Sequence, residues 1–229
     1  MKYYVYISQT KLDMLHGQML SPRRKRESSL GFDLKFLKGE VRRSQEPTES
    51  TYTRLSEVLE QLDQSDLIGT TRSGRRPFIR GTCNMIWATY WEPRSSITFW
   101  AHVNRGLVLA LAGSAYHVLG EQREGHAASA SLTSAIAHWI HSNIEEPFPK
   151  DAHEYAQKTT TYLDGEESKL SDYDIANGVW LAARFAKGQS SRFEFVAKVL
   201  HQSKWPDGFR DGKSKRIVLA SPLYVSLSR

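Results

Sequence analysis

The chain carries a strongly apolar segment at each end, and this pair constrains the fold more than any other feature. Residues 3–7 are all aromatic or β-branched, and residues 216–227 form a longer apolar segment. Uninterrupted runs of this kind are typical of strands buried on both faces. We therefore expect the first strand to be central in a sheet. Pro222 has no N–H for a ladder, so the last strand should be an edge strand or bulged at that point.

The segments between these two strands show helical and strand patterns in turn. Apolar residues recur through 51–64 at i, i+3, i+4 and i+7, which predicts an amphipathic helix. Three further strands, separated by turn signals, are expected over 77–90, 95–103 and 106–112. Less regular patterns indicate a turn or short helix over 11–18, a strand over 30–43, helices over 129–144 and 151–163, and either structure over 178–186 and 193–200.

These elements predict an α+β fold, with a mostly antiparallel sheet or partly closed barrel and two to four packed helices. The 229 residues contain no internal repeat or linker, so we expect a single domain over 1–229. The lone Cys83 excludes an internal disulfide and a cysteine-based metal cluster, which favours a reducing compartment. Because no signal peptide or transmembrane run is evident, we expect a cytoplasmic protein without a membrane partner.

Positive charge is concentrated near the N-terminus. The chain has a net charge of +6, and residues 1–43 hold ten Lys/Arg against four acidic residues. Such a zone favours anionic partners, although a solvated loop explains it equally well. One alternative function is therefore nucleic-acid binding through a set of basic residues: Arg23, Arg24, Lys25, Arg26, Arg42, Arg43, Arg75 and Arg76.

A first candidate binding site lies where an apolar strand runs into Gly113 and Ser114. Backbone N–H groups at a strand–glycine–helix junction can hold a phosphate, but the spacing matches neither a P-loop nor a dinucleotide fingerprint. The simpler interpretation makes Ser114 a helix cap. His117 follows three residues later, either as a base or ligand donor or as a packed histidine.

A second candidate is the polar group that follows the first strand, Lys11, Asp13 and Gln18, since residues at strand ends often line a cleft. With the first candidate it favours a regulatory or ligand-binding protein for a small anion, such as a nucleotide or phosphorylated metabolite. We expect no cofactor. Another alternative is a hydrolase or transferase that uses His117 with Asp13 or Ser114.

Metal binding and assembly receive less support from the sequence. His138 and His141 are spaced i, i+3 rather than the i, i+4 of zinc hydrolases, and we expect no metal site. Trp87, Trp91 and Trp100 lie in neighbouring predicted strands, where they could form either core or an aromatic interface. A homo-oligomer or a subunit of a larger assembly therefore stays open.

Three segments together resemble an uncharacterised family of bacterial hypothetical proteins that is frequent in actinomycetes. They are Tyr-Val-Tyr-Ile-Ser with the following Lys11-Leu-Asp-Met-Leu and Gln18, then Gly113-Ser-Ala-Tyr-His-Val-Leu-Gly120, and Val218-Leu-Ala-Ser-Pro-Leu-Tyr-Val225. The resemblance spans nearly the whole chain and implies a single domain. It implies no activity and no catalytic residues.

Overall fold

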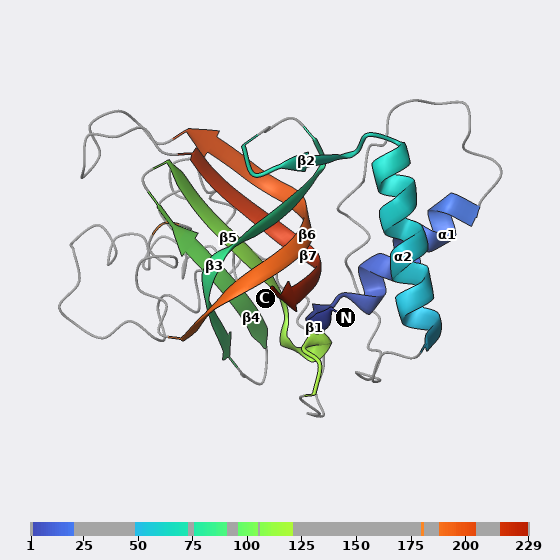
Figure 1. The fold of residues 1–229 in the computed structure, drawn as a ribbon, viewed down its shortest axis with the longest axis horizontal. Helices are drawn as coiled ribbons and strands as arrows, with labels where there is room; N and C mark the ends of the chain where they lie inside the picture. Colours follow the sequence, from blue (N-terminus) through green and yellow to red (C-terminus); the bar gives the residue numbers. More distant parts are fainter. Residues whose placement is uncertain are drawn as a thin grey trace, which may run out of the picture.

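A closed ring of five strands forms the centre of the fold (Figure 1). The computed structural model describes residues 2–20, 49–72, 76–90, 96–104, 106–120, 180, 188–204 and 216–228. Its elements are β1 (Tyr3–Ile7), α1 (Gln9–Leu20), α2 (Glu49–Gln64), β2 (Ile68–Thr70), β3 (Phe78–Tyr90), β4 (Ile97–Val103), β5 (Leu107–Ser114), the 3-10 turn η3 (Ala115–His117), β6 (Gln189–Lys204) and β7 (Arg216–Leu227).

These bounds confirm most of the local predictions. The helix over 51–64, the three middle strands and both terminal strands are present, residues 11–18 are helical, and residues 193–200 belong to a strand. The elements expected over 30–43, 129–144 and 151–163 lie outside the described residues, as does 178–186 apart from residue 180.

The ring closes through pairings between strands that are distant in the chain. β3 pairs with β4 and β4 with β5, both antiparallel, and β5 then pairs in parallel with β7. β6 pairs antiparallel with both β7 and β3, which completes the barrel. β2 and β1 extend the sheet beyond the ring, along β3 and β7 respectively. The α+β prediction is thus confirmed, and the mostly antiparallel strands form a barrel.

Alternate strand positions fill the barrel with aromatic and aliphatic side chains. Trp87 and Trp100 stack inside it, with ring centroids 6.2 Å apart and an interplanar angle of 7°. These two tryptophans are therefore core residues, while Trp91 lies outside the described residues. Cys83 also packs against this interior, where burial raises the pKa of its thiol to about 11.

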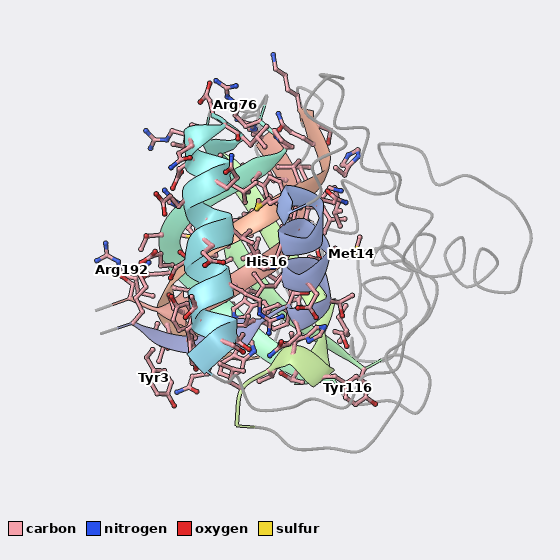
Figure 2. The ribbon with its side chains drawn as sticks, turned by 90° about the vertical axis from the view of Figure 1, so that its right-hand side faces the viewer. Tyr3, Met14, His16, Arg76, Tyr116 and Arg192 are labelled. Carbon is pink, nitrogen blue, oxygen red and sulfur yellow. The ribbon has the colours of Figure 1, made fainter. Side chains whose placement is uncertain are left out.

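The two helices cover the outside of the barrel beside β1, β6 and β7. In Figure 2 they lie next to each other in front of the sheet. Leu55, Val58 and Leu62 of α2 face inward, as the helical periodicity predicted, and meet Leu12 and Leu15 of α1 in a second core. This second core contains Ile7, Leu12, Leu15, Leu55, Val58, Leu62, Phe78, Val196, Leu223 and Tyr224.

β1 is an edge strand, so the prediction that it is central was wrong. Among the described strands it pairs with β7 alone. Its other edge meets the segment after η3, through a bridge between Tyr6 and Val118 and a 3.0 Å hydrogen bond from Leu119 N to Val5 O. Both faces of β1 are apolar because the barrel interior and the helix layer cover them, and this covering does not require a second partner strand.

The last strand is bulged at Pro222, which confirms the second of the two alternatives predicted there. β7 is paired on both sides, so it is not an edge strand. Its register with β6 shifts at this point, since Ala197 pairs with Pro222 but Val196 pairs with Tyr224, leaving Leu223 as the extra residue. The bulge lets a residue without an N–H stand inside an internal strand.

The packing of β1 against β5 predicts a specific sensitivity at Gly113. A Cβ atom there would lie 2.3 Å from the hydroxyl oxygen of Tyr6, whose side chain is fully buried. We expect Gly113→Ala to lower the free energy of unfolding by about 1–3 kcal/mol, measured by urea denaturation. Gly17→Ala is the control. A Cβ at Gly17 meets nothing within 4 Å, so this helical substitution should stabilise by about 0.5–1 kcal/mol.

The double variant Tyr6→Phe/Gly113→Ala identifies the cause of the loss. Because the Tyr6 hydroxyl oxygen is the atom nearest the added methyl group, its removal should restore part of the stability that Gly113→Ala loses. Additive effects of the two substitutions would contradict this explanation.

Candidate functional site

The candidate site lies where β5 and β7 separate. Their pairing ends at Leu111 and Ala220, and β1 takes over the same edge of β7 at Tyr224. Between these points Ser8 N donates a 2.9 Å hydrogen bond to Leu223 O as the chain passes from β1 into α1. Figure 1 shows η3 beside β1 and the start of α1. We define the junction site by Tyr6, Ser8, Lys11, Gly113, His117 and Pro222.

Lys11 supplies the positive charge of the junction site. It lies in the first turn of α1, and its ammonium donates hydrogen bonds to Ser8 Oγ and Pro222 O, both at 3.2 Å. Pro222 lies on the stretch of β7 that pairs with neither β5 nor β1, and Lys11 donates to its carbonyl there. A protonated amine has three N–H groups, and these two bonds leave one for a ligand.

The ammonium of Lys11 is enclosed by protein without an opposite charge. Burial, and then the nearby Lys198, lower the pKa of Lys11 from 10.5 to about 8. Lys198 stands on β6 opposite Ser221, one residue before Pro222. No carboxylate in the described part of the chain forms an ion pair with Lys11. The junction site therefore has an excess of positive charge.

His117 is the last residue of η3, and it is neutral at physiological pH. Its ring contacts the Tyr6 ring edge-on, with centroids 5.9 Å apart. Burial lowers the pKa of His117 to about 3, with a smaller contribution from the charge of Lys11. A neutral imidazole has one N–H donor and one acceptor nitrogen. The His117 side chain is half-buried.

Tyr6 and Gly113 form the floor of the junction site. The Tyr6 hydroxyl is buried and has no hydrogen bond of ordinary geometry within the described residues. Burial raises the pKa of this phenol above its usual value, and the Ser8 side chain offsets only part of the effect. Tyr6 thus stays protonated and keeps a donor at the base of the site. Gly113 leaves room for that hydroxyl because it has no Cβ atom.

Ser114 has the simpler of its two predicted roles. It precedes η3 in an extended conformation, and its Oγ accepts a hydrogen bond from Tyr116 N at 3.4 Å. In the described residues no hydrogen bond links His117 to Ser114 or to Asp13. The hydrolase or transferase alternative stays a prediction.

Asp13 and Gln18 point to other parts of the molecule. Asp13 is two positions from Lys11, hence on a different face of α1, and forms an ion pair with Arg54 of α2. Gln18 lies in the last turn of α1, about 10 Å along the axis from Lys11 at 1.5 Å per residue. Of the predicted residues, Gly113 and His117 contact Tyr6, Lys11 is bonded to Ser8 and Pro222, and Ser114 caps η3 beside His117.

Sequence reasoning missed three members of the junction site, namely Tyr6, Ser8 and Pro222. Tyr6 and Ser8 were visible only as part of an apolar strand and its end. For Ser8 the available signal was its spacing from Lys11, since a residue three positions back lies on the same side of a helix start. Pro222 could not be found from local patterns, because its role depends on which strand β7 pairs with at that point.

The basic residues that suggested nucleic-acid binding are mostly untested. Arg76 is the only one among the described residues, and it forms an ion pair with Asp66. The remainder lie outside the described residues: Arg23, Arg24, Lys25, Arg26, Arg42, Arg43 and Arg75. His138 and His141 also lie outside them, and no group of three or more His, Cys, Asp or Glu within them could hold a metal ion. No helix in the described segments is long and apolar enough to span a membrane.

The lowered pKa of His117 predicts a loss of stability in mild acid. Its pKa is about 3 in the folded protein and 6.5 when unperturbed, so the unfolded chain binds the proton first as the pH falls below 6.5. The free energy of unfolding should then fall by up to about 1.4 kcal/mol per pH unit. Denaturant titrations from pH 7 to pH 5 should show a smaller fall for His117→Gln.

His16→Gln is the matched control for this measurement. His16 lies on α1 (Figure 2) and is paired with Glu57 of α2 at 3.0 Å. Because His117 is retained, this variant should keep the wild-type pH dependence. Equal slopes for the wild type and His117→Gln would show that His117 is not held neutral.

Comparisons with known proteins place the chain in a family. No curated protein and no solved structure gave a significant match. The matching family is DUF7019, described as a family of unknown function, and the match covers residues 2–229. The segments that suggested an uncharacterised family in the sequence all fall within this range. The chain belongs to the DUF7019 family.

Proposed function

We propose that the protein binds a small anionic molecule, such as a nucleotide or a phosphorylated metabolite, at the junction site. The observation that carries this proposal is the ammonium of Lys11, which is enclosed by protein with no carboxylate partner among the described residues. An enclosed charge without a counter-ion costs several kcal/mol of stability. An anionic ligand would remove that cost, and the released free energy would contribute to binding.

The surroundings of Lys11 add to the positive potential. Lys198 is close enough to lower the pKa of Lys11, so two cations act on the same region. The first turn of α1 starts at Gln9, and its unpaired N–H groups favour negative charge nearby. A phosphate group offers several oxygens, which suits a site where donors arrive from separate elements.

The donors available to a ligand come from α1 and η3. Lys11 has one N–H left after its bonds to Ser8 and Pro222, and neutral His117 can donate from its ring. Both side chains are half-buried, so they are partly shielded from bulk water. Charge-assisted hydrogen bonds in such a setting are stronger than those on an open surface.

Thermal stability in the presence of ligands tests the proposal. We expect a ligand from a panel of nucleotides, sugar phosphates and inorganic phosphate to raise the melting temperature of the wild type. At a hundredfold excess over Kd the gain is about 2.7 kcal/mol. Lys11→Met should abolish this gain. The variant should still fold, because losing the buried charge offsets losing the bond to Pro222 O.

Arg192→Met provides the matched control, since it removes one positive charge from an exposed position on β6. It should respond to the ligand as the wild type does. The proposal fails if no member of the panel stabilises the wild type more than Lys11→Met.

Proton uptake gives a second, more specific test. Near pH 8 about half of the Lys11 side chains are neutral, and a bound anion would raise the pKa and recruit a proton. Calorimetry in two buffers of different ionisation enthalpy should therefore show uptake of up to about half a proton at pH 8. Uptake should be much smaller at pH 6, where Lys11 is already charged.

Lys11→Arg separates this effect from other titrating groups. Arginine stays charged at pH 8, so its complex should form without proton uptake. Uptake of the same size in Lys11→Arg, or none in the wild type, would show that the ligand does not bind beside Lys11.

A further inference from the structure

Arg216 stands at the start of β7, away from the junction site in the middle of the strand. It is the first residue of the strand, and its backbone N donates to Gly106 O at 3.0 Å. Pro222 is six positions further along β7, or about 20 Å at 3.3 Å per residue. The start of β5 and the end of β6 pair with it there, at Leu107 and Lys204. Any binding at Arg216 is thus spatially distinct from the junction site.

The guanidinium of Arg216 is anchored at one corner and unsatisfied along one edge. Its Nη1 donates to Arg72 O, in the turn after β2. Its Nε and Nη2 are both buried, and neither has a hydrogen-bond partner among the described residues. These two nitrogens form one edge of the planar group, with parallel N–H bonds that match the two oxygens of a carboxylate or phosphate.

A second cation lies opposite Arg216 on the neighbouring strand. Lys204 is directly opposite Arg216 in the antiparallel register of β6 and β7, so their Cβ atoms lie about 4.5–5.5 Å apart. Like charges opposite each other destabilise a sheet. Within the described residues no carboxylate pairs with either side chain. Burial also lowers the pKa of Arg216, as expected where no negative charge compensates it.

Other arginines of the same structure show the pairing that Arg216 lacks. Arg54 pairs with Asp13, Arg76 with Asp66 and Arg80 with Asp63. These three are surface pairs with partly exposed partners, which contribute about 0–1 kcal/mol each. The guanidinium with buried, unpartnered N–H groups is therefore the one with most to gain from an anion, because unsatisfied buried donors carry the full desolvation penalty.

We propose that Arg216 and Lys204 form a second anion site, which takes a small molecule through a carboxylate or phosphate group. Two oxygens of that group accept hydrogen bonds from Nε and Nη2 of Arg216. Lys204 adds charge from the neighbouring strand, and Arg72 O fixes the plane of the guanidinium. The site does not depend on ligand binding at the junction site.

Arginine side-chain NMR tests the proposal directly. The Nε–H signal of Arg216 is assigned in ¹⁵N-labelled full-length protein by its absence in Arg216→Lys. Acetate, succinate and inorganic phosphate are then titrated at constant ionic strength. We expect the Arg216 signal to move and saturate with at least one anion, while that of exposed Arg192 does not. Comparison of succinate with phosphate identifies which oxygen anion the site prefers.

Two substitutions examine the geometry of the site by calorimetry with the anion that binds. Arg216→Lys keeps the charge but loses the planar edge, so affinity should fall at least tenfold. Lys204→Met should weaken binding severalfold. Arg192→Lys, the matched control, should leave the affinity unchanged, and Lys11→Met should also leave it unchanged because the two sites are separate.

An Arg216 signal that stays in place, or that moves linearly without saturation as Arg192 does, overturns the proposal. So does an unchanged affinity in Arg216→Lys. If that variant does not fold, the NMR titration of the wild type still decides the question, with Arg216→Gln as the assignment variant. Loss of binding in Lys11→Met would show that the anion occupies the junction site instead.

Discussion

Two strands pair with successive parts of one edge of β7, and the placement of the junction-site residues depends on the gap between them. β5 pairs with the edge up to Ala220, and β1 pairs with it from Tyr224 onward. Neither strand reaches Pro222, whose carbonyl is bonded instead by the ammonium of Lys11. The gap also admits the Tyr6 side chain beneath Gly113. A polar cluster thus forms inside an otherwise apolar layer because backbone pairing is interrupted there.

Local patterns predicted the elements well, because their signals lie within a few residues. The bounds of β1 and β7 follow from runs of β-branched and aromatic residues, and α2 follows from its leucine and valine spacing. Closure of the barrel could not be predicted in this way. It depends on β6 pairing with β3 across more than a hundred residues, and β6 itself fits helix and strand patterns alike.

The position of β1 shows that apolar faces do not determine whether a strand is central or at the edge of a sheet. A strand with two apolar faces has its faces covered, but the edges may be covered by anything that supplies hydrogen bonds, here Val118 and Leu119. The residues of the candidate site likewise differ in whether a local pattern predicts them. Lys11 and His117 were predicted from their places after strands, whereas the Asp13 partner Arg54 lies 41 residues away and belongs to α2. Tertiary contacts of that kind have no local signature.

Several departures from ordinary burial rules lie beside β7, at Arg216 and near Pro222. The Tyr6 hydroxyl and two nitrogens of Arg216 are buried without partners, and Lys11 is enclosed without a counter-ion. Departures of this kind lower stability, and proteins concentrate them where they serve binding. In the described residues Trp100 Nε1 in the barrel interior and Ser203 Oγ on β6 are also buried without hydrogen-bond partners, whereas the Trp87 indole donates to Thr98 Oγ1 at 3.0 Å.

The two proposed sites differ in how they hold their charge, and this difference gives each a distinct dependence on pH. The pKa of Lys11 is about 8, so its charge changes within the physiological range. Above this pKa, part of the binding free energy of an anion is used to protonate the lysine. Arg216 stays charged throughout that range despite its lowered pKa, because a guanidinium starts from a much higher value. Affinity at the junction site should therefore weaken above pH 8. Affinity at Arg216 should remain constant over the same interval, since only the lysine loses its proton there.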